Sequence, residues 1–166
     1  MGVSTSQSYW QKVIDKFYEK YRGVAAWHKT ICHQAATVGK IFIPSGRYFN
    51  LGFEETPYGV KLPETKIKNY PVQGFGADLV LIARLRARQL LKKTKLVYVL
   101  ASTVHDSIVA DANMASYFQV ARILNHAIED VPRLASQMFK IDFNLPLKCE
   151  IKVGQNLKDL EPLTLD

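Results

Sequence analysis

The chain has 166 residues and a formal charge of +7, and 48% of its residues are hydrophobic. This length allows one core but is short for two ordinary domains, and the basic balance favours a polyanionic partner. No apolar run approaches the roughly 20 residues of a membrane span, and the N-terminus lacks the regions of a signal peptide. The isolated cysteines Cys32 and Cys149 suggest neither a zinc site nor a disulfide framework. We therefore expect a soluble cytoplasmic protein with no membrane partner.

Two helices are predicted in the N-terminal part of the chain. Ser8 to Gln11 has the form of a capping box, and the apolar residues after it recur at helical spacing as far as Gly23. A second pattern of the same kind ends at Gly39, and glycine is the usual residue just after a helix. We expect these two helices to pack as a pair.

The middle of the chain changes from turn-rich segments to a long helical pattern. Residues 40–53 predict a short hairpin around Pro44-Ser45-Gly46, because apolar segments flank this turn sequence. Residues 54–63 contain two prolines and a glycine and are expected to form a loop. From Glu64 to Leu91 the apolar spacing predicts one long helix, with a kinked or capped start at Pro71.

The next part predicts a second hairpin. An apolar run at Leu96–Leu100 and another at Ile108–Ala110 flank His105-Asp106-Ser107, so Asp106 is expected at the tip. A carboxylate between apolar strands is costly unless it is exposed at a turn or neutralised by a cation. The residues alone leave both explanations open.

Helical and strand patterns complete the chain. Asn113 is expected to cap a helix, and Pro132 either breaks that helix or begins another. Residues 145–153 alternate between apolar and charged side chains, as in a half-exposed strand. The fold class predicted is α+β, with an antiparallel sheet covered by helices on one face and preceded by a helical pair and a short hairpin.

Two segments give the chain a resemblance to a known family. Asn69-Tyr-Pro-Val-Gln73-Gly74 opens the long helix, and Val104-His105-Asp106-Ser107-Ile108 comes after a hydrophobic strand. Together they resemble the last two sequence signatures of family A DNA polymerases of bacterial or phage type. Phe17–Val24 and Ser45-Gly46-Arg47-Tyr48 also resemble segments of that family. The resemblance covers nearly the whole chain and implies that residues 1–63 complete the fingers subdomain and residues 64–166 build the C-terminal part of the palm.

The resemblance implies a role for each signature residue. Asp106 would be the catalytic carboxylate and a ligand of two Mg²⁺ ions, which bridge the primer 3′ hydroxyl and the incoming deoxynucleoside triphosphate. Asn69, Gln73 and His105 would approach the minor groove of the primer-template DNA, where every base pair presents acceptors at similar places. Without the resemblance, Asn69 and Gln73 would be taken as a helix cap and a solvated side chain.

The sequence departs from the family pattern at two positions. Ser107 replaces the glutamate that commonly comes after the catalytic aspartate, so a second carboxylate is missing there. Thr65 stands where the family usually has a minor-groove arginine, and Lys66 and Lys68 are candidates to replace it as DNA contacts. Arg47 resembles a residue of the family's Gly-Arg hairpin and is a candidate to contact the phosphates of the DNA backbone. A basic stretch either tracks phosphates or is a solvated helix face, and it comprises Arg84, Arg86, Arg88, Lys92, Lys93 and Lys95.

The resemblance also implies that half of an active site lies outside this chain. The family's first catalytic aspartate and its triphosphate-binding fingers helix have no counterpart in residues 1–16. One carboxylate holds two dications poorly, so we expect the chain to be inactive without an N-terminal polymerase polypeptide. The chain would then be a split subunit that starts at Met1, or a fragment of a longer enzyme.

Other functions remain open at this point. A non-catalytic nucleic-acid-binding module derived from a polymerase palm is one alternative, and a protein-interaction subunit whose basic charge serves solubility is another. Exposed aromatic residues would favour an interface, whereas buried ones would indicate core, and we expect core. The residues concerned are Trp10, Trp27, Tyr48, Phe49 and Phe53.

Overall fold

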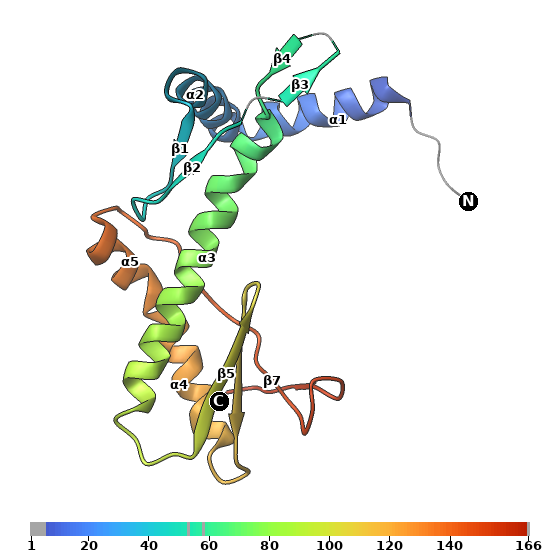
Figure 1. Cartoon of the computed structure of the whole chain (residues 1–166). Helices are drawn as coiled ribbons and strands as arrows, with labels where there is room; N and C mark the ends of the chain where they lie inside the picture. Colours follow the sequence, from blue (N-terminus) through green and yellow to red (C-terminus); the bar gives the residue numbers. More distant parts are fainter. Residues whose placement is uncertain (1–5, 53, 58, 166) are drawn as a thin grey trace. The chain divides into compact units, whose positions relative to one another are not determined.

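The computed structural model describes residues 6–52, 54–57 and 59–165. It confirms the α+β class, with strands that pair antiparallel two by two (Figure 1). No helix in these ranges is long and apolar enough to cross a membrane. In chain order the elements are α1 (Gln7–Lys20), α2 (Arg22–Val38), β1 (Lys40–Phe42), β2 (Tyr48–Asn50), β3 (Glu54–Thr56), β4 (Gly59–Lys61), α3 (Glu64–Leu91), β5 (Tyr98–Val104), β6 (Ser107–Ala112), α4 (Tyr117–Glu129), α5 (Val131–Phe139), β7 (Lys152–Val153) and β8 (Glu161–Pro162).

The chain divides into two compact units. The first contains the chain up to Ile43 together with Arg47–Val72, and the second contains Pro44–Gly46 and the chain from Gln73 onward. The division between the larger parts falls within α3, because the first turns of this helix belong to one unit and the remaining turns to the other. The predicted fingers and palm boundary at residues 63 and 64 is a functional division and stays a prediction.

The helical pair of the first unit is confirmed, but its boundaries differ from those predicted. Ser6 caps α1 by accepting a hydrogen bond from the Tyr9 N–H at 3.4 Å, so the capping box expected at Ser8 is wrong. Gly23 does not end this helix, since the break lies at Tyr21 and Gly23 is already within α2. Gly39 ends α2 as expected, because it adopts a left-handed conformation with φ of 69°.

The hairpin predicted after α2 is confirmed as β1 and β2, up to Phe53, which lies outside the described residues. The loop expected at residues 54–63 is wrong, because β3 and β4 pair there from Glu54↔Lys61 to Thr56↔Gly59. Pro57 lies between these two strands and Pro63 comes after them, so neither proline takes a hydrogen-bonded strand position.

A small core joins the first turns of α3 to the preceding elements of the first unit. Ile31 and Ala35 of α2 pack with Ile41 of β1 and Ile67 of α3, and Ile67 is fully buried. The long helix itself is confirmed, and Pro71 lies inside it without ending it. The register of the β1–β2 hairpin is fixed by Ile41, because a shift of one residue would move this side chain out of the core.

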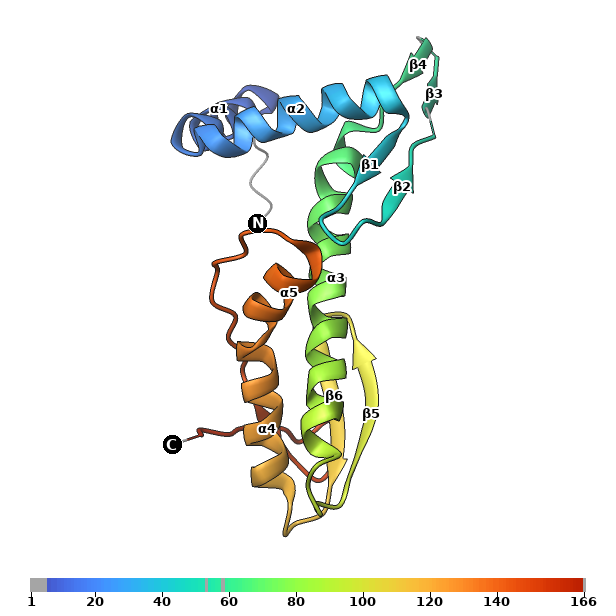
Figure 2. The same cartoon turned by 90° about the vertical axis from the view of Figure 1, so that its left-hand side faces the viewer.

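The second unit packs α3, α5 and the β5–β6 hairpin around one core. Ile82 and Ala83 of α3 contact Val131 and Ala135 of α5, and Ile108 of β6 packs against this cluster. Figures 1 and 2 both show the hairpin running alongside α3. Ile108 thus anchors the hairpin next to the turn that carries Asp106.

Two sequence predictions about the helix starts of this unit have different outcomes. Pro132 begins α5, as one of the two alternatives proposed. The cap expected at Asn113 is wrong, because Ser116 directly precedes α4 and the Asn113 carbonyl instead accepts hydrogen bonds from the N–H groups of Ser116 and Tyr117 at 2.9 and 3.0 Å. Asn113 therefore forms a turn before the helix.

The strand expected at residues 145–153 is paired only at Lys152–Val153. Its burial nevertheless alternates as predicted from Leu147 onward, with Lys148, Glu150 and Lys152 exposed. The expectation fails at Leu145, which is 63% exposed. Leu147 packs against the core of the second unit, so the predicted apolar face is partly used although most of the segment is not paired as a strand.

A partly buried ion pair links α3 to the junction between α4 and α5. The Nε and Nη2 atoms of Arg86 lie 2.8 and 2.7 Å from Oδ2 of Asp130, and Arg133 Nη2 lies 3.4 Å from Oδ1. Burial tends to raise the pKa of Asp130, but hydrogen bonds from Arg86 and Arg133 outweigh it and leave the pKa below its ordinary value. Arg86 therefore has a structural partner, and the phosphate-tracking role considered for it loses support.

We expect Arg86→Met to destabilise the second unit by roughly 1.5–3 kcal/mol, because Asp130 would lose its closest charged partner. Hydrogen exchange of the α4 and α5 amides measures this loss. Arg88→Met is the matched control on an exposed position of the same helix. A carboxyl group whose pKa is lowered in the folded protein stabilises the fold at pH values above its unfolded pKa, which is 3.8 for Asp130. The difference in stability between the Arg86 variant and the wild type should therefore shrink as pH falls through and below that value. Equal hydrogen-exchange protection in Arg86→Met and Arg88→Met at neutral pH would contradict the proposed role of the ion pair.

Candidate primer-template and metal site

The β5–β6 hairpin places Asp106 at its tip, as predicted. Val104 pairs with Ser107, so His105 and Asp106 alone form the turn, and both are exposed. Apolar residues of the strands hold the hairpin against the helices, whereas its turn faces solvent. Exposure at the turn therefore avoids the desolvation cost of this carboxylate, and the chain by itself needs no cation to explain its position.

His105 adopts an unusual backbone conformation in this turn. Its φ is 53°, and among the described non-glycine residues it shares a positive φ only with Lys140. A positive φ at the first of two turn residues alone is the pattern of a type II′ turn, where glycine is preferred. Strain of about 1–2 kcal/mol is expected for a side chain there, and such strain often occurs at functional sites.

Ser107 uses its hydroxyl within the turn. Its Oγ donates a hydrogen bond of 2.8 Å to the Val104 carbonyl, directly across the hairpin. The hydroxyl thus stabilises the end of the ladder, and Asp106 is the only carboxylate of the turn. Within the described residues, no three His, Cys, Asp or Glu side chains gather as a metal-binding group. A metal held at Asp106 would need further ligands.

A β-bulge interrupts the strand that leads to the turn. The register shifts between Leu100 and Ser102, so Ala101 has no direct partner on β6. Arg84 of α3 donates a hydrogen bond of 3.4 Å to the Leu100 carbonyl beside this bulge. A bulge increases strand twist and bends the strand at that point. Arg84 therefore contacts the backbone of β5 at the bulge, on the strand that leads to the turn.

The predicted minor-groove residues of α3 are both exposed. Asn69 and Gln73 are four residues apart in one helix, and this spacing places them on the same side of it. Asn69 does not cap the helix, because α3 begins at Glu64. The structure thus removes the capping interpretation and leaves two amide side chains available to the solvent.

The two predicted lysine contacts are ion-paired instead. Lys66 Nζ lies 2.9 Å from Glu54, and Lys68 Nζ lies 2.7 Å from Glu64. The hydrogen bond that Lys68 donates to Glu64 raises the pKa of Lys68, and the hydrogen bond that Lys66 donates to Glu54 raises the pKa of Lys66. The side chains of Lys66 and Glu54 are both about half exposed, so their ion pair is weak, and a phosphate could displace Glu54. Lys68 is 29% exposed and less accessible.

Arg47 comes directly after a glycine in the turn of the β1–β2 hairpin. Gly46 has a φ of 85°, and the Arg47 carbonyl accepts a hydrogen bond of 3.0 Å from the Ile43 N–H. The Arg47 residue is exposed. This geometry agrees with a side chain directed by a tight turn, while its predicted contact with the DNA backbone stays a prediction.

Several aromatic residues that we expected in the core are exposed. Trp10 and Trp27 are 55% and 39% exposed, Tyr48 is 50% exposed, and Phe49 is partly buried. Phe53 lies outside the described residues. The core interpretation is wrong for the first three. Helix α1 buries none of its residues, α2 buries Ile31 and Ala35 but not Trp27, and Tyr48 lies on the outer side of β2. Helical periodicity identified the apolar face of α1 but could not show whether this face is covered.

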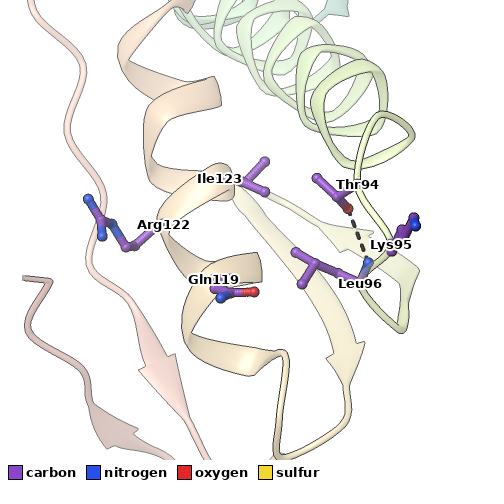
Figure 3. A pocket seen from close by; sticks show the side chains of 6 residues that line it. All are labelled: Thr94, Lys95, Leu96, Gln119, Arg122 and Ile123. Carbon is purple, nitrogen blue, oxygen red and sulfur yellow. Dashed lines mark hydrogen bonds between the residues drawn. The ribbon is translucent and has the colours of Figure 1, made fainter.

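An open hollow in the second unit was not predicted. It is lined by Thr94, Lys95 and Leu96 after α3, and by Gln119, Arg122 and Ile123 of α4 (Figure 3). The Leu96 N–H donates a hydrogen bond of 3.3 Å to Thr94 Oγ1 at its edge. Figure 3 shows Lys95 and Arg122 extending away from the other side chains, so the hollow offers few converging polar groups for a ligand.

The comparisons with known proteins identify the family. Residues 1–159 match the family model described as DNA polymerase family A, so this chain belongs to that family. The DNA polymerase of Bacillus phage SP01 is 24% identical over 167 residues, which cover 99% of this chain and 18% of that protein. DNA polymerase I of Aquifex aeolicus is 25% identical over 136 residues, which cover 80% of this chain and 22% of that protein. This chain therefore spans about a fifth of the length of these relatives.

A solved structure shares the fold. The polymerase domain of Pol1 from M. smegmatis, in complex with a DNA primer-template and dNTP, matches with a TM-score of 0.69. The match covers 78% of this chain and 23% of that one, at 18% sequence identity. The likeness shows the fold, and it agrees with the family assignment made from the sequence.

We expect His105→Gly to leave the stability of the β5–β6 hairpin unchanged or raise it by up to about 1 kcal/mol. Glycine relieves the strain of the positive φ but loses more entropy on folding. Hydrogen exchange of the β5 and β6 amides measures this change. A loss of more than about 1 kcal/mol would contradict the strain and would show that the imidazole holds the turn together.

Proposed function

We propose that the chain is the C-terminal fingers and palm part, or a split subunit, of a DNA-directed DNA polymerase. It acts in DNA replication in the cytoplasm of a bacterial or phage-infected cell. Residues 1–63 complete the fingers and residues 64–166 form the C-terminal part of the palm. The observation that carries the proposal is Asp106, exposed at the apex of a strained two-residue turn in a chain that matches the polymerase family over residues 1–159.

The proposed reaction is templated deoxynucleotidyl transfer assisted by two Mg²⁺ ions. Asp106 would hold these ions through its carboxylate, and the metals would stabilise the attacking 3′ oxygen and the leaving pyrophosphate. The exposed turn supports this role, because nothing in the hairpin covers the carboxylate. The Ser107 hydroxyl is already donated to Val104, so it supports the turn that presents Asp106 and adds no negative charge.

Primer-template DNA is the second proposed ligand. Asn69, Gln73 and His105 would donate hydrogen bonds to acceptors of the minor groove, which lie at similar positions for every base pair. The exposure of all three side chains supports this assignment. Arg47 would contact the backbone phosphates. Lys66 and Lys68 would replace the minor-groove arginine that the family usually has at position 65, although each is now paired with a carboxylate.

A polypeptide from the N-terminal part of the polymerase is the proposed partner. It would supply the first carboxylate of the metal site and the residues that bind the triphosphate. Two features support this partner. Among the described strands, β5 and β6 pair only with each other, which leaves edges for another strand. The apolar residues of α1 are also uncovered, as expected for a surface that is buried in a larger assembly.

A non-catalytic nucleic-acid-binding module is the second candidate function. It is favoured by the single carboxylate at the turn and by Thr65, which stands where the family usually has an arginine. A chain of this kind would bind primer-template DNA without magnesium-dependent turnover. The two proposals differ in one measurable property, which is extension of a primer.

We expect Asp106→Ala to reduce primer extension by at least about 10³-fold, because the metals would lose a ligand on this chain. The assay contains magnesium, all four deoxynucleotides and a primer-template, first with this chain alone and then with the product of the reading frame upstream. The matched control is Asp111→Ala, which removes an exposed carboxylate from β6 of the same hairpin. DNA binding of the Asp106 variant should stay within a few-fold of the wild type.

Activity only in the mixture, lost with Asp106→Ala and kept with Asp111→Ala, would establish a polymerase that needs its partner. Absence of extension in a mixture whose components demonstrably bind each other would favour the non-catalytic module. Loss of DNA binding together with activity in the Asp106 variant would indicate that this residue is structural.

A further inference from the structure

The β1–β2 hairpin has two different faces. Ile41 and Phe49 are paired across the hairpin, and their side chains share one face. Ile41 is buried in the core of the first unit, and the ring of Phe49 lies 5.3 Å from that of Tyr70. The opposite face presents Lys40, Phe42, Tyr48 and Asn50, and we call it the outer hairpin face.

The outer hairpin face exposes two large aromatic rings. Phe42 is 59% exposed and Tyr48 is 50% exposed, although they lie opposite each other in the register. Their ring centroids are 5.8 Å apart and the planes are inclined by 49°. Because the rings are tilted rather than stacked, neither covers the face of the other completely.

A cation lies directly beside these rings. The Nζ atom of Lys40 is 4.4 Å from the centroid of the Tyr48 ring, within the range of a cation–π interaction. This contact orders the lysine over the aromatic surface while its ammonium group keeps further donors. The outer hairpin face therefore combines aromatic surface with positive charge within one short hairpin.

This combination identifies the chemistry of a ligand. A protein partner for two exposed aromatic rings would need only an apolar surface, and the lysine would add desolvation cost to that contact. Single-stranded nucleic acid instead offers flat bases for the rings and phosphates for the ammonium group, and this is how strand-tracking proteins bind without sequence preference. The net charge of +7 favours a polyanion in addition.

We propose that the outer hairpin face is a binding site for single-stranded DNA, in which bases stack on Phe42 and Tyr48 and Lys40 contacts a phosphate. In duplex DNA the base faces are already stacked on their neighbours, so the site selects unpaired nucleotides. The proposal rests on the proposed polymerase function for its biological setting, since a strand being copied is unpaired beyond the primer end. Its chemistry can be tested without any polymerase activity.

The test is fluorescence anisotropy of the 166-residue chain with a labelled single-stranded oligothymidylate and with a blunt duplex of two complementary DNA strands. Phe42→Leu and Tyr48→Leu keep apolar bulk but remove the ring. Each should weaken single-strand binding by roughly 5- to 100-fold, the range expected for loss of one base-stacking contact. Binding of the duplex should change by less than about twofold.

Two further variants separate stacking from folding. Tyr9→Leu is the matched control, because Tyr9 is 52% exposed on α1 and has no part in the hairpin, and it should leave both affinities unchanged. Tyr48→Phe keeps the ring and should retain wild-type binding. Lys40→Gln should reduce the slope of log affinity against log salt by about 0.7 for the single strand.

The proposal is overturned if the ring variants bind the single strand as well as the wild type does, or if the chain has no measurable single-strand affinity. It is also overturned if single-strand and duplex affinities fall by the same factor, or if Tyr9→Leu has the same effect as Tyr48→Leu. None of these outcomes affects the Asp106 test of primer extension. Failure of that test, in turn, would leave single-strand binding by the outer hairpin face intact.

Discussion

The structure depends on one constraint, which is that an ionisable side chain must stand at the end of an apolar hairpin. Asp106 would be unfavourable at a position of β5 or β6 that packs against the helices, because a buried unpaired carboxylate is too costly. The two-residue turn exposes it, but this turn requires a positive φ at His105. The chain accepts backbone strain at one residue so that the next is presented to solvent.

The remainder of the second unit holds this strained turn in place. Ile108, two residues beyond Asp106, packs against the core formed by α3 and α5. Arg84 contacts the backbone at the bulge of β5, and the Arg86 to Asp130 ion pair ties α3 to the helices that come after the hairpin. A turn that is anchored only by its own hydrogen bonds would relax, whereas packing on one face keeps this one fixed.

Much of this arrangement could be predicted from the sequence, because the features involved are local. The β5–β6 hairpin and the length of α3 follow from apolar patterns, and the end of α2 follows from Gly39. The cap of α1 was misplaced because Ser6 and Ser8 offer equivalent side chains two residues apart. The β3–β4 hairpin was missed because its prolines and glycine are as typical of an irregular loop as of a turn.

Other features could not be predicted because they depend on partners distant in sequence. The pairing of Arg86 with Asp130 spans 44 residues, so no local pattern distinguishes Arg86 from Arg88 on the same helix. The exposure of Trp10 and Tyr48 also escaped prediction, since an apolar face is the same in sequence whether a core or a partner covers it. The sequence therefore identified the apolar faces, but not what covers each of them.

The distribution of positive charge has a consequence for DNA binding. The net charge of +7 suggests many phosphate contacts, but Lys66, Lys68 and Arg86 are paired with carboxylates, and Arg84 donates to a backbone carbonyl. Each of these cations already has an internal partner, which reduces its net contribution to phosphate binding. For the proposed DNA binding, electrostatic attraction would therefore supply less affinity than the sequence suggests, and uncharged contacts from amides and aromatic rings would supply more. Such contacts depend less on salt than phosphate contacts do, and they would suit the proposed binding to DNA of any sequence.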